Sequence, residues 1–144
     1  MIKKQKVFYT EYEIYLKQND FYLYGIIDKL IIDGDSAIII DYKTDSLQKY
    51  SAKEKLENYK YQLLFYSFLV KKINPKIKNI KSMLLFIQDP SQDASIYITD
   101  ELLQKFEVGM IEGIKSMRVE KYNKKKSHCK NCYFSDEKNN CVVE

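Results

Sequence analysis

Two apolar, β-branched segments on either side of a polar turn constrain the fold of this 144-residue chain most strongly. The first covers residues 26–33 and the second covers residues 37–43. The sequence between them, Asp33-Gly34-Asp35-Ser36, is typical of a hairpin, because glycine and short polar side chains adopt the backbone conformations that tight turns require. The sequence therefore predicts two neighbouring antiparallel strands.

Two aspartates lie opposite each other if the loop of this hairpin is residues 34–35 or residues 33–36. In that register Asp28 pairs with Asp41, with Cβ atoms about 4.5–5.5 Å apart. Carboxylates at this distance repel each other unless a cation or a shared proton lies between them. A two-residue loop of Asp33 and Gly34 would instead bring Ile26 opposite Asp41. Both registers stay open from the sequence.

The chemistry of this strand end points to a divalent metal. Mg²⁺ and Mn²⁺ prefer oxygen ligands and would remove the repulsion between the two aspartates. Lys43 lies two residues after Asp41, so a strand places both side chains on one side. The alternative is a charged strand end that faces water, but a solvated face would show alternating polar residues, and the segment before Asp41 is wholly apolar.

The length predicts one domain, and the composition predicts that it is globular. The chain has 45% hydrophobic residues, four glycines and two prolines. No apolar run approaches the roughly 20 residues of a membrane span, and the first residues do not resemble a signal peptide, so we expect a soluble, cytoplasmic (intracellular) protein that uses no membrane. The net charge of +4 permits a polyanionic partner without requiring one.

The periodicity of the chain predicts the order βββ-α-ββ-α. A first strand precedes the hairpin, a helix opens with the capping-box sequence Ser51-Ala52-Lys53-Glu54, and a second helix opens around Thr99-Asp100. The remaining expected boundaries are a strand over about 7–16, a helix end near 74–75, and strands over 80–87 and 94–98. This order predicts a mixed β-sheet flanked by helices, of the α/β or α+β class. We expect a core over residues 1–120 and a lysine- and cysteine-rich tail, 121–144, packed on the same domain.

Four segments together resemble the PD-(D/E)XK nuclease superfamily, and most of all its RecB/AddB-like branch with the related CRISPR-adaptation and mitochondrial exonucleases. The segments are Gly25-Ile26-Ile27-Asp28, Asp41-Tyr42-Lys43-Thr44, Gln62 with Tyr66, and the C-terminal cysteines. The resemblance implies a restriction-endonuclease-like fold. It also implies a Mg²⁺- or Mn²⁺-dependent deoxyribonuclease of DNA repair or recombination, acting as an exonuclease on single-stranded DNA ends.

The same resemblance assigns roles to individual residues. Asp28, Asp41 and the main-chain carbonyl of Tyr42 would hold the metal, and Lys43 would lie beside the attacking water and the scissile phosphate. A metal-bound water has a lowered pKa and can attack near neutral pH. Lys43 would then orient the water and stabilise the transition state.

Four further polar residues are candidates for the site. Gln62 and Tyr66 lie four residues apart on one side of a helix and would support the site and contact nucleic acid, although Tyr66 also belongs to the apolar stripe. Glu11 matches a glutamate that precedes the Gly-x-x-Asp segment in this branch, and Glu13 shares its strand face. Either glutamate could assist a second metal or simply face solvent.

The chain departs from the family pattern at both ends. RecB-like enzymes commonly place a helix with a metal-binding histidine before the first strand, and here only six residues precede that strand. In the tail, Cys129, Cys132 and Cys141 have a metal-type spacing, and the resemblance implies a [4Fe-4S] cluster whose fourth, upstream cysteine is absent. A Zn²⁺ site with His128 and unliganded thiols are the alternatives.

The partners implied are DNA and a larger assembly. Lysines surround the cysteines and could contact a DNA backbone or be solvated surface; they are Lys121, Lys124, Lys125, Lys126 and Lys130. The upstream histidine and cysteine of the family pattern could come from another polypeptide. The alternative function is therefore a catalytically weak nucleic-acid-binding module of a helicase-nuclease or CRISPR-adaptation complex.

Overall fold

A computed structural model describes residues 6–44, 47 and 50–119 of the chain. The backbone forms two compact units, residues 1–109 and residues 110–144. The first unit contains a sheet, one whole helix and the first half of a second helix. The predicted division of the chain after residue 120 stays a prediction.

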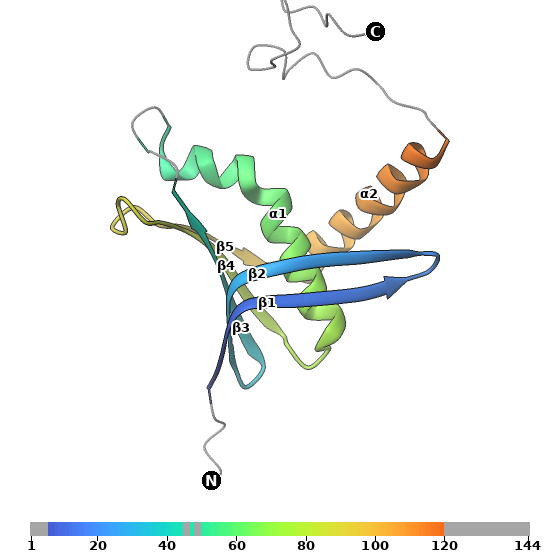
Figure 1. Ribbon diagram of the computed structural model, residues 1–144, viewed down its shortest axis with the longest axis horizontal. Helices are drawn as coiled ribbons and strands as arrows, with labels where there is room; N and C mark the ends of the chain where they lie inside the picture. The colour runs from blue at the N-terminus through green and yellow to red at the C-terminus, as the bar shows by residue number, and fades with distance from the viewer. Residues whose placement is uncertain (1–5, 45–46, 48–49, 120–144) are drawn as a thin grey trace, which may run out of the picture. The chain divides into compact units, whose positions relative to one another are not determined.

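The first unit is built on a mixed five-stranded sheet (Figure 1). Its strands lie side by side in sequence order, so each strand is a neighbour of the next along the chain. Their bounds are β1 Val7–Gln18, β2 Phe21–Asp33, β3 Ser36–Lys43, β4 Asn79–Phe86 and β5 Ala94–Ile98. The first three strands are antiparallel, β3 and β4 are parallel, and β5 is antiparallel to β4.

Residues with left-handed backbone conformations close the first two hairpins. Asn19 follows β1 with a φ of 54°, and Gly34 follows β2 with a φ of 65°. Asparagine and glycine tolerate this region better than other residues. Because Asp33 pairs with Ser36, the second loop consists of residues 34 and 35. The predicted loop of residues 34–35 is therefore confirmed, and the alternative loop of residues 33–34 is wrong.

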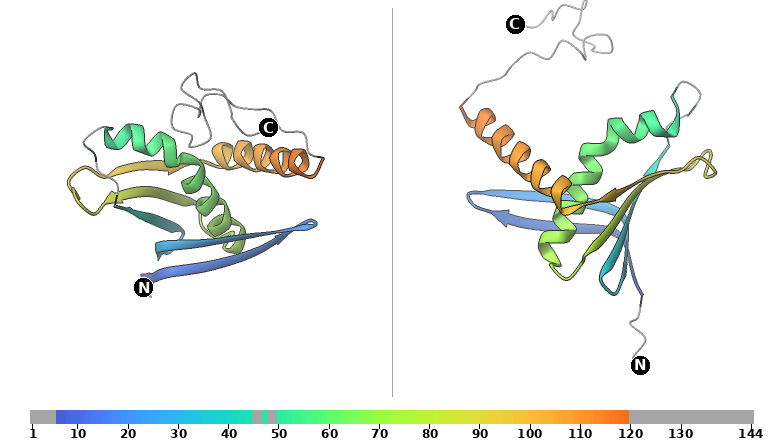
Figure 2. Two further views of the ribbon diagram at one scale, coloured as in Figure 1. Left: turned by 45° about the horizontal axis from the view of Figure 1, so that its top comes forward. Right: turned by 180° about the vertical axis from the view of Figure 1, so that it is seen from behind.

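Helix α1, Ala52–Ile73, connects the two parallel strands. Its predicted capping box is confirmed, because the Ser51 side chain accepts a hydrogen bond from the Glu54 amide while the Glu54 carboxylate accepts one from the Ser51 amide at 2.8 Å. A strand pair can be parallel only if the connection returns to the same end of the sheet. The helix makes that return, and it lies across one face of the sheet (Figure 2).

The hydrophobic core lies between α1 and this face of the sheet. Alternate residues of β3 and β4 point toward the helix, so Ile39, Leu84 and Phe86 are fully buried. A buried hydrogen bond of 2.8 Å between the Ser67 and Ser82 hydroxyls joins α1 to β4. The spacing of apolar residues predicts one stripe along α1, made of Leu56, Tyr59, Leu63, Tyr66 and Val70. The buried side of the helix is wider than this stripe and also includes Leu64, Ser67, Phe68 and Leu69.

The strands of the first hairpin reverse their core-facing side part-way along. In a regular strand every second residue faces the same side. Here two core-facing pairs, Tyr9 with Leu30 and Tyr12 with Ile27, lie three residues apart. Glu11 lies between them with a φ of 50°, which is uncommon for a residue other than glycine. Both strands bend along their length (Figure 1).

Helix α2, Asp100–Arg118, completes the predicted order βββ-α-ββ-α, which is confirmed together with the mixed α/β sheet. Its first half belongs to the first unit, where Leu103 is buried and the ring centroids of Phe106 and Phe68 lie 5.9 Å apart. The Thr99 hydroxyl accepts a hydrogen bond from the Leu102 amide at 3.2 Å and caps the helix. Within the described residues, no helix is long and apolar enough to cross a membrane.

Gly25 allows α1 to approach β2 closely. A Cβ atom at this position would lie 2.9 Å from Leu69 Cδ1 and 3.4 Å from Tyr66 Cε1. We expect Gly25→Ala to lower the free energy of unfolding by about 1–3 kcal/mol, because the extra methyl overpacks a buried contact. Urea denaturation measures this change.

Gly109→Ala is the matched control for this substitution. Gly109 lies within α2, and nothing lies within 4 Å of the position that a Cβ atom would take there. We expect this variant to gain up to about 1 kcal/mol of stability, since alanine is the better helix former. Equal stability changes in the two variants would contradict the close approach at Gly25.

Candidate active site

Asp28 and Asp41 meet where the pairing of β2 and β3 ends. The last pair of the ladder is Lys29 with Ile40, and the next position in this register brings Asp28 to the level of Asp41. The ladder ends there, and Asp28 Oδ2 accepts a hydrogen bond from the Tyr42 amide at 2.8 Å. Where the main-chain pairing of β2 and β3 ends, the Asp28 side chain is therefore the acceptor for the Tyr42 amide.

Asp41 is a buried carboxylate at the C-terminal end of β3. Only 3% of the residue is exposed, because its side chain points toward α1 like the other core-facing residues of the strand. Lys43 lies two residues further on the same side, and its Nζ atom is 2.7 Å from Asp41 Oδ2. The predicted arrangement of the two side chains is therefore present as an ion pair.

Gln62 of α1 joins both members of this ion pair. Its Nε2 atom donates to Asp41 Oδ1 at 3.1 Å, and its Oε1 atom accepts from Lys43 Nζ at 3.1 Å. The Nε2 atom also donates to the Tyr66 hydroxyl at 3.0 Å. The structure therefore brings together four of the candidates, Asp41, Lys43, Gln62 and Tyr66, in one hydrogen-bonded network.

Burial changes the acidity of two groups in this network. It raises the pKa of Asp41, because a carboxylate loses hydration inside the protein. The charge of Asp28 acts in the same direction, whereas the Lys43 ammonium lowers the pKa of Asp41. Burial also raises the pKa of the Tyr66 hydroxyl, and the hydrogen bond from Gln62 lowers it. The site thus contains an ionisable carboxyl that is costly to charge without a cation nearby.

Tyr59 is part of the site although the sequence gives it no functional signal. The Lys43 Nζ atom lies 3.8 Å from the centroid of its ring, within the range of a cation–π interaction. Tyr59 precedes Gln62 by three residues, so the two side chains are neighbours on the helix. Its place in the apolar stripe of α1 predicts a core residue, and only the fold brings Lys43 over the ring.

One oxygen of the site fits a bound cation. Asp41 Oδ2 is buried, and among the described residues it has the Lys43 ammonium at 2.7 Å as a cationic partner but no donor with hydrogen-bond alignment. The carboxylates of Asp28 and Asp41 form the kind of oxygen donor set that Mg²⁺ and Mn²⁺ prefer. However, no three His, Cys, Asp or Glu side chains converge as a metal site within residues 6–44, 47 and 50–119.

The two glutamates of β1 lie outside the network. Glu11 is exposed, and its place in the β1–β2 register is opposite Asp28, between the pairs Thr10 with Lys29 and Tyr12 with Ile27. Glu13 accepts hydrogen bonds of 3.3 Å from two tyrosine hydroxyls, Tyr15 and Tyr24. Glu11 therefore lies at the same level of the sheet as Asp28, whereas Glu13 is hydrogen-bonded to tyrosines outside the network.

The predicted tail lies outside the described residues. This applies to the three cysteines, to His128 and to the lysine cluster that begins at Lys121. The proposed [4Fe-4S] or Zn²⁺ site therefore stays a prediction.

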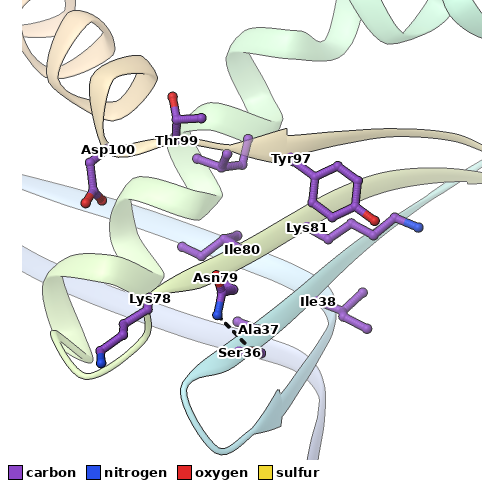
Figure 3. Close-up of a pocket in the computed structure, with 11 residues that line it drawn as sticks. Ser36, Ala37, Ile38, Lys78, Asn79, Ile80, Lys81, Tyr97, Thr99 and Asp100 are labelled. Atoms are coloured by element: carbon purple, nitrogen blue, oxygen red, sulfur yellow. Dashed lines mark hydrogen bonds between the residues drawn. The ribbon is translucent and has the colours of Figure 1, made fainter.

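A separate pocket of about 560 Å³ lies at the other end of the strands (Figure 3). It is lined by the start of β3, by the start of β4 and by residues 97–100. Lys78 and Lys81 extend in different directions around it. The Asp41–Lys43 pair is at the opposite end of β3 and does not contribute to this pocket.

The sequence matches one protein family over most of its length. Residues 2–136 match the family model of the PD-(D/E)XK nuclease superfamily. The chain belongs to this superfamily. The expected superfamily is confirmed, and its restriction-endonuclease-like fold agrees with the mixed sheet and two helices described above.

The curated relatives of this superfamily member are much longer proteins. The chain is 37% identical over 70 residues to an ATP-dependent helicase/nuclease subunit of Thermoanaerobacter sp. (strain X514), and equally so to that of Thermoanaerobacter pseudethanolicus. The match covers 48% of this chain and 6% of each relative. It agrees with the RecB/AddB-like branch, and the chain corresponds to only a small part of these relatives.

Two crystal structures share the fold of this superfamily member. The structure of SSO0001 has a TM-score of 0.56 and 21% identity, and the match covers 88% of this chain and 57% of that one. A candidate exonuclease from Eubacterium rectale has a TM-score of 0.50 and 13% identity, with 87% and 50% covered. At these identities the comparison supports the fold and not the activity.

The raised pKa of Asp41 predicts that a cation bound at this carboxylate would bind in a pH-dependent way. We expect Mg²⁺ to raise the Tm near neutral pH, since a ligand that binds only the folded state stabilises it. Acidification protonates Asp41, so this increase is lost as the pH falls through the raised pKa. The loss begins at a higher pH than an exposed aspartate, with a pKa of about 3.9, would give. Thermal denaturation with and without Mg²⁺ measures it.

Two variants test this pH dependence. Asp41→Ala removes the carboxylate, and we expect no Mg²⁺-dependent change in Tm at any pH. Glu101→Ala removes an exposed carboxylate of α2 and retains the full effect. A change in Tm that persists in Asp41→Ala would show that Mg²⁺ binds elsewhere.

Proposed function

We propose that this chain is a metal-dependent nuclease that hydrolyses phosphodiester bonds of DNA. In this proposal Asp28 and Asp41 hold the metal with the main-chain carbonyl of Tyr42, and Lys43 acts on the phosphate. The observation that carries the proposal is the buried Asp41 carboxylate, which has one oxygen bound to Gln62 and the other 2.7 Å from the Lys43 ammonium. Membership of the nuclease superfamily supports it.

Mg²⁺ or Mn²⁺, when bound, would supply a water of lowered pKa and neutralise charge on the phosphate oxygens. The residues of the chain prepare the site for that chemistry. Gln62 fixes the orientation of the Asp41 carboxylate through Oδ1 and leaves Oδ2 directed at the position of Lys43. The Lys43 ammonium carries a positive charge that can stabilise the additional negative charge of a pentacoordinate phosphorus in the transition state.

The surroundings of the site increase the effect of these charges. Only 14% of the Lys43 side chain and 4% of the Asp41 side chain are exposed. Electrostatic interactions are stronger where water is excluded, and groups held in place need no reorganisation during the reaction. Tyr66 accepts a hydrogen bond from Gln62 and thereby holds the amide in the orientation that both Asp41 and Lys43 use.

The finer features of the substrate are also part of the proposal. We infer an exonuclease that acts on single-stranded DNA ends, within a larger helicase-nuclease assembly. The support is the resemblance to the RecB/AddB-like branch and the match to a helicase/nuclease subunit, of which this chain spans 6%.

A second candidate function is a catalytically weak nucleic-acid-binding module of such an assembly. The observation that favours it is the small ligand set, since the described residues contain no cluster of three metal-binding side chains. This candidate predicts DNA binding without cleavage.

Cleavage of end-labelled DNA distinguishes the two candidates. We expect digestion of single-stranded DNA with Mg²⁺ or Mn²⁺ and no digestion with EDTA. Asp41→Ala and Lys43→Ala should each lower kcat by about 10²-fold or more, the loss typical for removal of one group that stabilises transition-state charge. Denaturing gels give the rate and the size of the products.

Lys105→Ala is the control for the lysine substitution. The Lys105 side chain is 72% exposed and pairs with Glu101 on the surface of α2. We expect the activity of this variant to equal that of the unchanged protein. Metal-dependent cleavage that survives both Asp41→Ala and Lys43→Ala would overturn the assigned site, and binding without cleavage would favour the module.

A further inference from the structure

The Lys43 ammonium contacts an aromatic ring as well as its polar partners. Its Nζ atom lies 3.8 Å from the centroid of Tyr59, 2.7 Å from Asp41 Oδ2 and 3.1 Å from Gln62 Oε1. We propose that Tyr59 is a positioning residue that holds the Lys43 ammonium in place for the reaction. This inference rests on the proposed function, because it assigns Lys43 to the chemistry.

The Tyr59 ring is itself held by the core. It packs, together with other half-buried side chains, against the cluster of Leu63, Leu84 and Phe86, which are fully buried. These residues come from α1 and β4, so the ring is supported by two elements. A ring fixed in this way offers Lys43 a rigid surface rather than a mobile side chain.

The surroundings favour a strong interaction between the ammonium and the ring. Cation–π interactions strengthen when the cation is shielded from water. The Lys43 side chain is 14% exposed, so little water competes with the ring. The ring also limits the motion of a flexible four-carbon side chain, which would otherwise lose much rotamer entropy in a single position.

Tyr59 differs from the other partners of Lys43 in its chemistry. Asp41 is also the proposed ligand of the metal, so a divalent cation and Lys43 compete for the same carboxylate. An aromatic ring is not a ligand for Mg²⁺ or Mn²⁺, which prefer oxygen atoms. The contact with Tyr59 can therefore persist when the bond between Lys43 and Asp41 weakens, and the ammonium stays close to the site.

The competing explanation is that Tyr59 only fills the core. In that case a leucine at position 59 would support the activity as well as an aromatic ring does. The two explanations differ for a pair of variants. Tyr59→Phe keeps the ring, and Tyr59→Leu keeps an apolar side chain but removes the ring.

Steady-state cleavage of DNA compares these variants. We expect Tyr59→Phe to retain kcat and Tyr59→Leu to lower it by about tenfold with little change in KM, because the ring acts on a group of the transition state. Circular dichroism verifies that each variant is folded, and Tyr59→Met replaces Tyr59→Leu if the latter does not fold. Equal kcat in all variants, or an equal loss in Tyr59→Phe and Tyr59→Leu, would overturn the proposal.

Acetylation of lysines gives a measurement that does not depend on activity. Each protein is treated with acetic anhydride without metal, and mass spectrometry compares the modification of Lys43 with that of the exposed Lys105. We expect Lys43 to be modified about fivefold faster in Tyr59→Leu than in the unchanged protein, and Tyr59→Phe to keep the protection. Unchanged protection in Tyr59→Leu would overturn the proposal. If the unchanged protein does not cleave DNA, the proposed function fails, and acetylation alone still decides whether the ring holds Lys43.

Discussion

The contact between the buried Asp41 carboxylate and Lys43 is the interaction on which the arrangement of the site depends. Moving two opposite charges out of water costs several kcal/mol per ion, and their attraction offsets this cost only with good geometry and further hydrogen bonds. Gln62 supplies those bonds, since it donates to one member of the pair and accepts from the other. Well-packed apolar residues would often stabilise a fold as much at such a position, so stability alone does not explain the pair.

The position of β3 in the sheet makes this contact possible. β3 has the antiparallel β2 on one side and the parallel β4 on the other. Because the chain must return to the start of β4, helix α1 crosses the face toward which Asp41 points. Gly25 of β2 permits the helix to approach closely enough for Tyr66 to join the network. The connection that makes the sheet mixed therefore also supplies the second layer of the site.

Local signals in the sequence predicted most of the fold. The capping box at Ser51 and the glycine in the second hairpin loop each depend on residues close in the chain, and the structure confirms both. The wider buried side of α1 and the reversal of the strands near Glu11 were not predictable in this way. Both result from packing between distant segments, and a left-handed glutamate leaves no pattern in the sequence.

The sequence by itself determined the order of the elements, the apolar strand that ends in Asp41 and the spacing that puts Lys43 on the same side. It left open which loop closes the second hairpin, and hence whether Asp28 meets Asp41. The tertiary structure decided the register, joined Gln62 to the ion pair and placed the Tyr59 ring over Lys43. The physical reason is that strand periodicity is encoded by near neighbours, whereas a buried charge acquires its partners only when a helix packs across the sheet.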